Sequence, residues 1–173
     1  MSQIVPDDKD WTFVLQEKCN ECGAEVSGVS VNSVVAQLPE VVQRYRSVLD
    51  RPNARTRSSA TRWSDQEYVV HVAEMFEIMS GRLDLMLDQH EPTFPNWDQD
   101  VAADQGNYNT LSTSQAVDKL QAAAQTYGGK LANIAPEKYS RKGMRSNGSA
   151  FTVESLTQYA WHDVVHHLRD LKA

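Results

Sequence analysis

The sequence predicts an all-α fold, a four-helix bundle with one long connection between its second and third helices. Four segments repeat apolar residues at the three- and four-residue spacing of an amphipathic helix, and capping or proline signals bound them. A chain of 173 residues suits one domain. We therefore expect a single helical-bundle domain over residues 1–173, with residues 1–28 as an N-terminal extension. The predicted helices span residues 32–50, 64–89, 112–135 and 152–173.

The first predicted helix, over residues 32–50, contains Pro39 and is followed by Pro52. A proline inside a helix removes a backbone donor, so we expect a kink at Pro39 or a later start of the helix. The helical spacing is carried by Val34, Val35, Leu38, Val41, Val42, Tyr45, Val48 and Leu49.

The second and third helices have defined starts. In "SDQE", Ser64 can cap the second helix while Glu67 reaches back to the cap, which is a capping box. "STSQ" offers a similar box at Ser112 for the third helix, which Pro136 ends. These signals fix where two helices begin better than the apolar spacing alone.

The last helix begins at Thr152, with Glu154 in a first turn that favours negative charge. Before it, Asn147 and Gly148 form the dipeptide most typical of a tight hairpin, so we expect a small β-hairpin there. Residues 90–110 form a long loop between the second and third helices. Loops of this length inside a compact domain are often functional.

The composition excludes some classes of function. The net charge of −6 argues against a general nucleic-acid binder, which normally carries a basic patch. No apolar run has the length of a membrane span. The first residues lack a basic region followed by an apolar core, and only two cysteines are present. We therefore expect a cytoplasmic protein that acts on a small molecule.

The histidines are the candidate metal ligands. His162 and His166 are four residues apart, on one face of the last helix and off its aliphatic stripe. His71 lies one turn into the second helix, at the edge of its apolar arc. Three imidazoles could meet at one end of the bundle and leave a coordination position open. The alternative is a solvated or capping role on the helix. We expect His167 to lie at the surface or behind a ligand, and His90 to pair with the dipole at the C-terminal end of the second helix.

Four segments of the chain resemble the DinB-like (DinB/YfiT) superfamily of metalloenzymes, and within it an actinobacterial branch. They are "WTFVLQEKCNECG", "RWSDQEYVVHVAEMF", "LMLDQHEPTFPNWDQD" and "RSNGSAFTVESLTQYAWHDVVHHL", in the same order as in the family. The resemblance implies a four-helix bundle that holds one divalent metal ion through three side chains. By the family pattern these are His71, His162 and His166.

The resemblance also implies a chemistry. Related proteins are S-transferases and an isomerase that use a low-molecular-weight thiol such as mycothiol or bacillithiol. A coordinated thiol loses its proton, which makes a nucleophile at neutral pH. We therefore expect a Zn²⁺ enzyme, with Ni²⁺, Fe²⁺ or Mn²⁺ as alternatives. It would transfer a thiol to a small electrophile or carry out a metal-assisted hydrolysis. The alternative is a non-catalytic metal- or ligand-binding module of a stress response, which a fourth protein ligand such as Asp98 would favour.

Further candidate residues lie near the predicted metal end. Arg82 could bind a substrate carboxylate or form a structural salt bridge. Asn96 and Trp97 could contact a cofactor, and Asp98 could act as a general base or hold a ligand in place. Asp163 could orient a neighbouring imidazole, or it could be an ordinary surface residue.

Cys19 and Cys22, in "CNEC", form half of a zinc knuckle, but no second C-x-x-C is present. We consider three interpretations: a local turn with two thiols, a metal shared with other residues, or a redox pair. A homodimer is a further expectation for a bundle with several surface-directed apolar residues.

Overall fold

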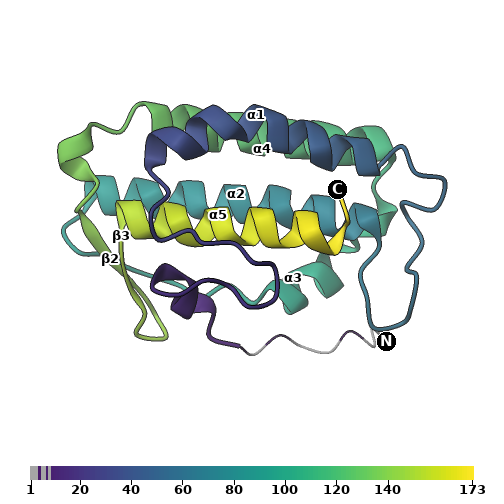
Figure 1. Cartoon of the computed structure of the whole chain (residues 1–173), viewed down its shortest axis with the longest axis horizontal. Coiled ribbons are helices and arrows are strands. Elements are labelled where there is room, and N and C mark those ends of the chain that lie inside the picture. Colours follow the sequence, from purple (N-terminus) through teal and green to yellow (C-terminus); the bar gives the residue numbers. More distant parts are fainter. Residues whose placement is uncertain (1–3, 5–6, 8) are drawn as a thin grey trace.

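The computed structural model describes residue 4, residue 7 and residues 9–173. The other residues of the predicted N-terminal extension, 1–3, 5–6 and 8, lie outside the described residues. The predicted helical bundle is confirmed (Figure 1). Its four long helices are α1 (Val31–Val48), α2 (Asp65–Asp88), α4 (Thr113–Ala132) and α5 (Val153–Asp170).

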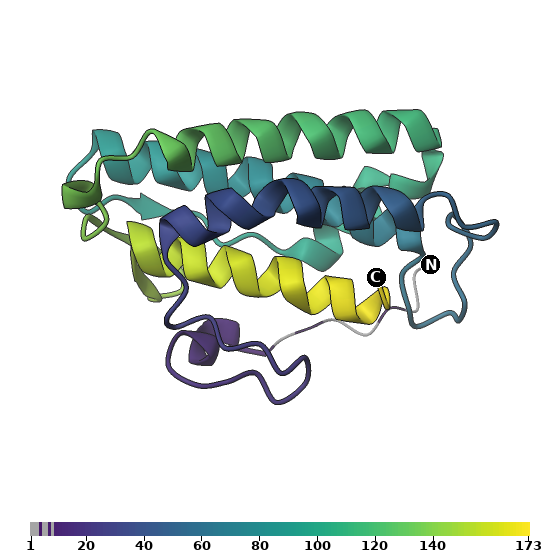
Figure 2. The same cartoon turned by 45° about the horizontal axis from the view of Figure 1, so that its top comes forward.

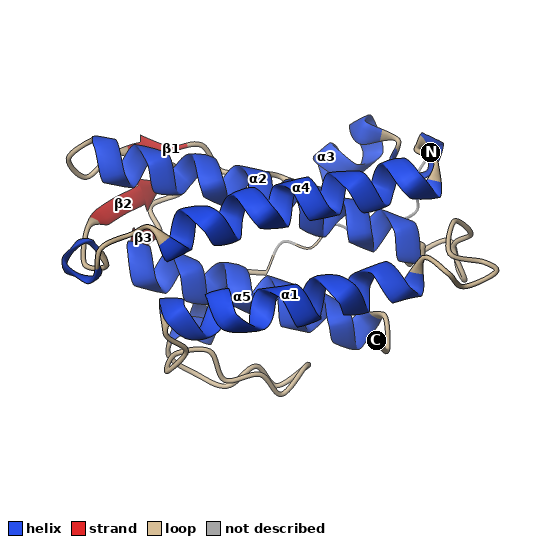
Figure 3. Cartoon of the chain, turned by 90° about the horizontal axis from the view of Figure 1, so that it is seen from above, coloured by secondary structure: helices blue, strands red, loops and turns tan. Residues whose placement is uncertain are grey.

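The four long helices form a ring in which each packs mainly against two neighbours, and α1 and α2 also contact each other. Helix α4 packs against α1 and α2, and α5 packs against the same two helices from the other side. The view from above in Figure 3 shows α2 and α4 on one side and α1 and α5 on the other. Because the long connection after α2 returns along the bundle, α2 and α4 point in the same direction (Figure 1).

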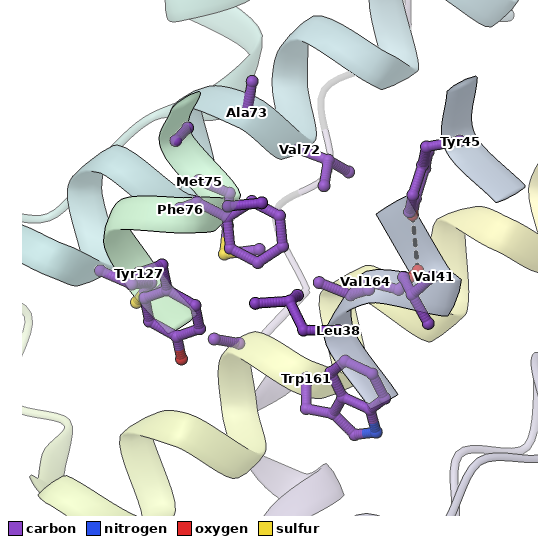
Figure 4. Close-up of a cluster of buried hydrophobic side chains, with 14 of the residues drawn as sticks. Leu38, Val41, Tyr45, Val72, Ala73, Met75, Phe76, Tyr127, Trp161 and Val164 are labelled. Carbon is purple, nitrogen blue, oxygen red and sulfur yellow. Dashed lines mark hydrogen bonds between the residues drawn. The ribbon is translucent and has the colours of Figure 1, made fainter. Parts of the chain in front are cut away.

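The core lies inside this ring, and all four helices contribute to it (Figure 4). The Tyr45 hydroxyl donates a hydrogen bond of 2.5 Å to the carbonyl of Val164, which ties α1 to α5. The buried aromatic and aliphatic side chains around it include Leu38, Val41, Val72, Met75, Phe76, Tyr127 and Trp161.

The predicted helix starts are confirmed. Ser64 and Ser112 each accept from the backbone three residues on, and both capping boxes are complete. Thr152 caps α5 in the same way. Helix α1 begins at Val31, capped by Ser30, and continues through Pro39, so the alternative of a later start was wrong.

The connection after α2 is more structured than the predicted loop. It contains strand β1 (Thr93–Phe94), helix α3 (Gln99–Gly106) and the short helix η2 (Tyr108–Thr110). The Asp98 carboxylate starts α3 by accepting from two backbone N–H groups, and Asn107 ends it with a left-handed φ of 46°. The expectation of a plain loop was therefore wrong, because a local cap stabilises one short helix within it.

The predicted hairpin is confirmed as strands β2 (Lys142–Arg145) and β3 (Ala150–Thr152), which pair antiparallel. Gly148 takes the positive φ of 94° in its turn. Strand β1 adds in parallel to β2, with Thr93 opposite Met144. The resulting three-stranded sheet closes the end of the bundle where α5 begins (Figure 1).

The N-terminal segment lies along the outside of α5 (Figures 1 and 2). It contains the short helix η1 (Trp11–Leu15), which packs on α5. A third short helix, η3 (Pro136–Lys138), follows α4. Among the described residues, no helix is both long and apolar enough to cross a membrane.

Candidate metal centre

Helix α5 carries two pairs of candidate ligands, and the second pair is offset from the first by one residue along the helix. His162 and His166 form the first pair, and Asp163 and His167 form the second. Consecutive residues on an α-helix point about 100° apart, so the two pairs face different sides. The structure places each pair in a different cluster of candidate metal ligands.

The first cluster, here called the His–Asp cluster, consists of His71, Asp163 and His167. One ligand atom from each lies within 4.8 Å of the other two. The Asp163 carboxylate sits between the imidazoles, with Oδ2 at 3.4 Å from His71 Nε2 and Oδ1 at 3.5 Å from His167 Nε2. The two rings meet edge to face, with centroids 5.0 Å apart.

Buried polar atoms without a hydrogen bond are concentrated in the His–Asp cluster. Among the described residues, five buried side-chain nitrogen or oxygen atoms have no hydrogen-bond partner. Three of them belong here: Nδ1 and Nε2 of His71 and Oδ2 of Asp163. The 3.4 Å approach of His71 to Asp163 is thus within ion-pair distance without hydrogen-bond geometry. Such orphaned groups are costly unless a ligand satisfies them, and nitrogen and carboxylate oxygen are ligands for a divalent cation. These residues fit a metal ion.

Aromatic rings and a second carboxylate hold the cluster in place. Trp97 stacks on the His71 ring with centroids 5.3 Å apart and planes inclined by 4°. The Trp63 ring contacts the same imidazole, with ring centroids 5.0 Å apart. On the other side, His167 Nδ1 is hydrogen-bonded to Asp170 Oδ2 at 2.9 Å. A carboxylate behind an imidazole orients that imidazole and makes it a stronger ligand.

The electrostatics of the cluster favour an ionised Asp163 between the two imidazoles. Burial raises the pKa of Asp163, but His167 and His71 outweigh it and lower that pKa well below its usual range. Burial also lowers the pKa of His167, but Asp163 and Asp170 outweigh it and raise that pKa to about 9. Asp163 is therefore ionised at neutral pH, and its negative charge attracts a metal cation.

The second cluster, here called the Cys–His cluster, consists of Cys19, Cys22, His162 and His166, again with ligand atoms within 4.8 Å of one another. Cys19 Sγ lies 3.9 Å from His166 Nδ1, and Cys22 Sγ lies 3.7 Å from His162 Nε2. Burial, and then His166, lowers the pKa of His162 to about 4, while burial lowers that of His166.

A small cavity of about 60 Å³ lies between the two clusters. It is lined by Asp7, Trp11, Gln99, Tyr159, His162, Asp163, His166 and His167. A wider hollow of about 380 Å³ adjoins it and also reaches His166 and His167. A small molecule could therefore approach the His–Asp cluster from the side covered by the N-terminal segment.

The structure divides the ligands expected from the sequence between the two clusters. His71 belongs to the His–Asp cluster, whereas His162 and His166 belong to the Cys–His cluster. His167, expected at the surface or behind a ligand, lies with His71 in the His–Asp cluster, and its side chain is only 13% exposed. Asp163 lies between these two imidazoles rather than on the open helix surface.

The other candidates lie apart from the ligand atoms, except Trp97. Asp98 is exposed and caps α3. Asn96 is exposed, and its backbone N–H donates to Ser146. Arg82 is buried; its guanidinium donates to the Pro95 carbonyl at 3.1 Å, and none of the ion pairs found among the described residues involves it.

The Arg82 guanidinium also packs over the Phe94 ring, at 4.9 Å from its centroid. Burial, followed by repulsion from Arg145, lowers its pKa to about 10. In this structure Arg82 therefore helps to hold the connection after α2 against the bundle.

Comparison with known proteins gives a fold. No family model and no curated protein matches the chain. The chain is similar to the solved structure of YfiT from Bacillus subtilis. The match covers 91% of this chain and 89% of the YfiT chain, with a TM-score of 0.68 and 17% sequence identity. YfiT is described as a probable metal-dependent hydrolase with an unusual four-helix bundle topology. The chain therefore has a fold similar to that of YfiT, as its resemblance to the DinB/YfiT superfamily implied.

Proposed function

We propose that this chain is a metal-dependent enzyme that holds one divalent ion with His71, Asp163 and His167. One observation carries the proposal: three ligand atoms from α2 and α5 converge, and buried atoms of His71 and Asp163 have no hydrogen bond. The resemblance to the DinB/YfiT superfamily supports it. So does the shared fold with YfiT, itself described as a probable metal-dependent hydrolase.

This ligand set takes the place of the trio His71, His162 and His166 expected from the sequence. The family pattern of one histidine on the second helix and two ligands four residues apart on the last helix is kept. The two ligands on the last helix are each one residue later in the chain, Asp163 and His167 in place of His162 and His166. A carboxylate then stands where the family usually has a histidine, and both are ordinary zinc ligands.

The ligand set favours catalysis over a purely structural role. Three protein ligands leave a coordination position open, as in catalytic zinc sites. Asp98, the fourth ligand that would have favoured a non-catalytic module, is occupied as the cap of α3. When bound, a divalent cation would supply Lewis acidity and lower the pKa of a coordinated water or thiol. Two nitrogens and one carboxylate occur in catalytic Zn²⁺ sites, and Ni²⁺, Fe²⁺ and Mn²⁺ accept the same ligands.

Residues around the cavity supply the remaining functions of an active site. Asp170 keeps the His167 ring oriented. Tyr159 lines the cavity, and its hydroxyl oxygen accepts a hydrogen bond of 3.3 Å from Arg145 Nη1. Its O–H is then directed to donate elsewhere, for example to an oxygen of a substrate in the cavity. Burial raises the pKa of Tyr159, so the hydroxyl keeps its proton at neutral pH.

We propose metal-assisted hydrolysis of a small molecule as the reaction, and thiol transfer to a small electrophile as the second candidate. The hollow of about 380 Å³ beside the cluster supports thiol transfer as a candidate, because it offers room for part of a low-molecular-weight thiol such as mycothiol. The expected homodimer and the cytoplasmic location stay predictions. Light scattering on the purified protein would test the dimer.

The test compares wild type with His71→Gln, using protein purified without an affinity tag. His90→Ala is the matched control, because His90 is exposed and lies in neither cluster. We expect His71→Gln to lose one equivalent of metal and all turnover of a panel of esters, amides and thiol–electrophile pairs. Unchanged metal content in both His71→Gln and His167→Gln would refute the site.

A further inference from the structure

The Cys–His cluster contains the complete ligand set of a structural zinc site. Two thiols and two imidazoles converge from opposite ends of the chain, and neither cysteine forms a disulfide. Sulfur and nitrogen ligands in this combination select Zn²⁺ in a tetrahedral arrangement. Four protein ligands leave no coordination position open, unlike the three of the His–Asp cluster.

The distances in the cluster are close to those of an assembled site. Zinc bonds of about 2.3 Å to sulfur and about 2.0 Å to nitrogen place two such ligands about 3.5 Å apart at tetrahedral corners. Cys22 Sγ and His162 Nε2 are 3.7 Å apart, and Cys19 Sγ and His166 Nδ1 are 3.9 Å apart. Both pairs are therefore within a few tenths of an ångström of that spacing, and all four ligand atoms lie within 4.8 Å of one another.

The backbone around the cysteines is folded into a tight turn that aims both thiols at α5. The N–H of Gly23 donates to the carbonyl of Cys19 at 2.9 Å, and the N–H of Cys19 donates to the carbonyl of Ala24 at 2.8 Å. Gly23 takes a φ of +77°, which other residues adopt at a cost. The N–H of Ala24 donates to Cys22 Sγ at 3.4 Å, which helps to hold that sulfur in place.

We propose that Cys19, Cys22, His162 and His166 bind one zinc ion that fastens the N-terminal segment to α5. The segment packs on the core through apolar side chains that are mostly only half-buried, such as Trp11, Phe13 and Leu15. Among residues 9–29, only Val14, Cys19 and Val26 are fully buried. Besides the cluster, the amide of Gln158 donates to two backbone carbonyls of the segment, each at 3.1 Å.

The zinc ion also places one wall of the cavity between the clusters. The Trp11 ring lies against both imidazoles, with centroids 5.3 Å from that of His162 and 4.9 Å from that of His166. Trp11 and Asp7, from the same segment, line this cavity together with Asp163. The proposal rests on the Cys–His cluster alone, so it stands or falls independently of catalysis at the other cluster.

The first test uses wild-type protein, so it does not depend on how a variant folds. The full chain, purified without an affinity tag, is stripped and reloaded with Co²⁺. We expect thiolate-to-cobalt charge-transfer absorption and two thiols that react with Ellman's reagent only after chelation. Free reaction of both thiols in the metal-loaded protein, with no charge-transfer band, would overturn the proposal.

The second test assigns the ligands. Cys22→Ser changes one atom at a half-buried position, so the bundle should fold. We expect it to lose one zinc ion and the charge-transfer band, whereas His71→Gln should lose the ion of the His–Asp cluster and keep the charge-transfer band. Trypsin should also cut Cys22→Ser faster after the exposed Lys18, because the segment is released. Zinc content equal to wild type in both Cys22→Ser and Cys19→Ser would refute the assignment.

Discussion

Two neighbouring histidines on α5 provide the sharpest test of how the ligands are divided. His166 lies with the two cysteines, and His167 lies with His71. Their side chains are similarly buried, at 12% and 13% exposed, so substitution by alanine is matched in size and setting. We expect wild type to carry roughly two ions per chain and each variant to carry roughly one. Removal of a direct ligand should weaken its ion by more than the roughly 10–100-fold caused by loss of an outer partner.

The two variants should differ in which ion they lose. Loaded with Co²⁺, His166→Ala should lose the thiolate charge-transfer band, and His167→Ala should keep it. Without metal, His167→Ala should be less stable than wild type by about 1–3 kcal/mol in urea unfolding, because it loses a charged hydrogen bond of 2.9 Å to Asp170. Loss of the charge-transfer band in both variants would show that the two pairs share one ion, and the division of ligands would be refuted.

Two further predictions concern groups next to the ligands and at the start of α2. Asp170→Asn should weaken the ion of the His–Asp cluster about 10–100-fold in a chelator competition, because Asp170 orients His167; unchanged affinity would contradict this role. Burial raises the pKa of Glu67, but Arg57 and the capping contacts outweigh it and lower that pKa below 4.5. The stabilisation by Glu67 is therefore complete above the unfolded-state pKa and lost as pH falls through the folded-state pKa. Glu67→Gln should lower the free energy of unfolding in urea by about 1–3 kcal/mol at pH 7 and by less at pH 4. An equal decrease at the two pH values would contradict the ion pair.

The main helices could be predicted because their signals are local. Capping boxes at Ser64 and Ser112 and the turn at Gly148 each depend on a few consecutive residues. Helix α3 was missed for the same reason. It has eight residues and only Ala103 is buried, so it shows almost no apolar periodicity. Its cap, Asp98, looked like a candidate catalytic group because a carboxylate in a loop has several uses.

The spacing of the candidate ligands could not show which pair on α5 lies next to His71. A pair at 162 and 166 and a pair at 163 and 167 have the same separation. The aliphatic stripe contains the missing signal: Trp161, Val164, Leu168 and Leu171 are all buried. At 100° per residue, Asp163 and His167 lie about 80–120° from the centre of this stripe, whereas His162 and His166 lie about 140–180° away. The nearer pair must face a neighbouring helix, which here is α2 with His71.

His162 and His166, the pair on the outer side of α5, can meet further ligands only from outside the bundle. The placement of the N-terminal segment brings Cys19 and Cys22 to them. No local pattern in "CNEC" states that it will meet a helix about 140 residues later in the chain, since His162 and Cys22 are 140 positions apart. The two clusters differ in the ways that separate structural from catalytic sites. One has four ligands including two sulfurs, and the other has three ligands, one of them a carboxylate, beside a cavity. Because adjacent residues of one helix belong to both clusters, a zinc ion in the outer cluster would fix the N-terminal segment relative to the inner cluster. It would also keep Trp11, which packs on His166, in the lining of the cavity between them.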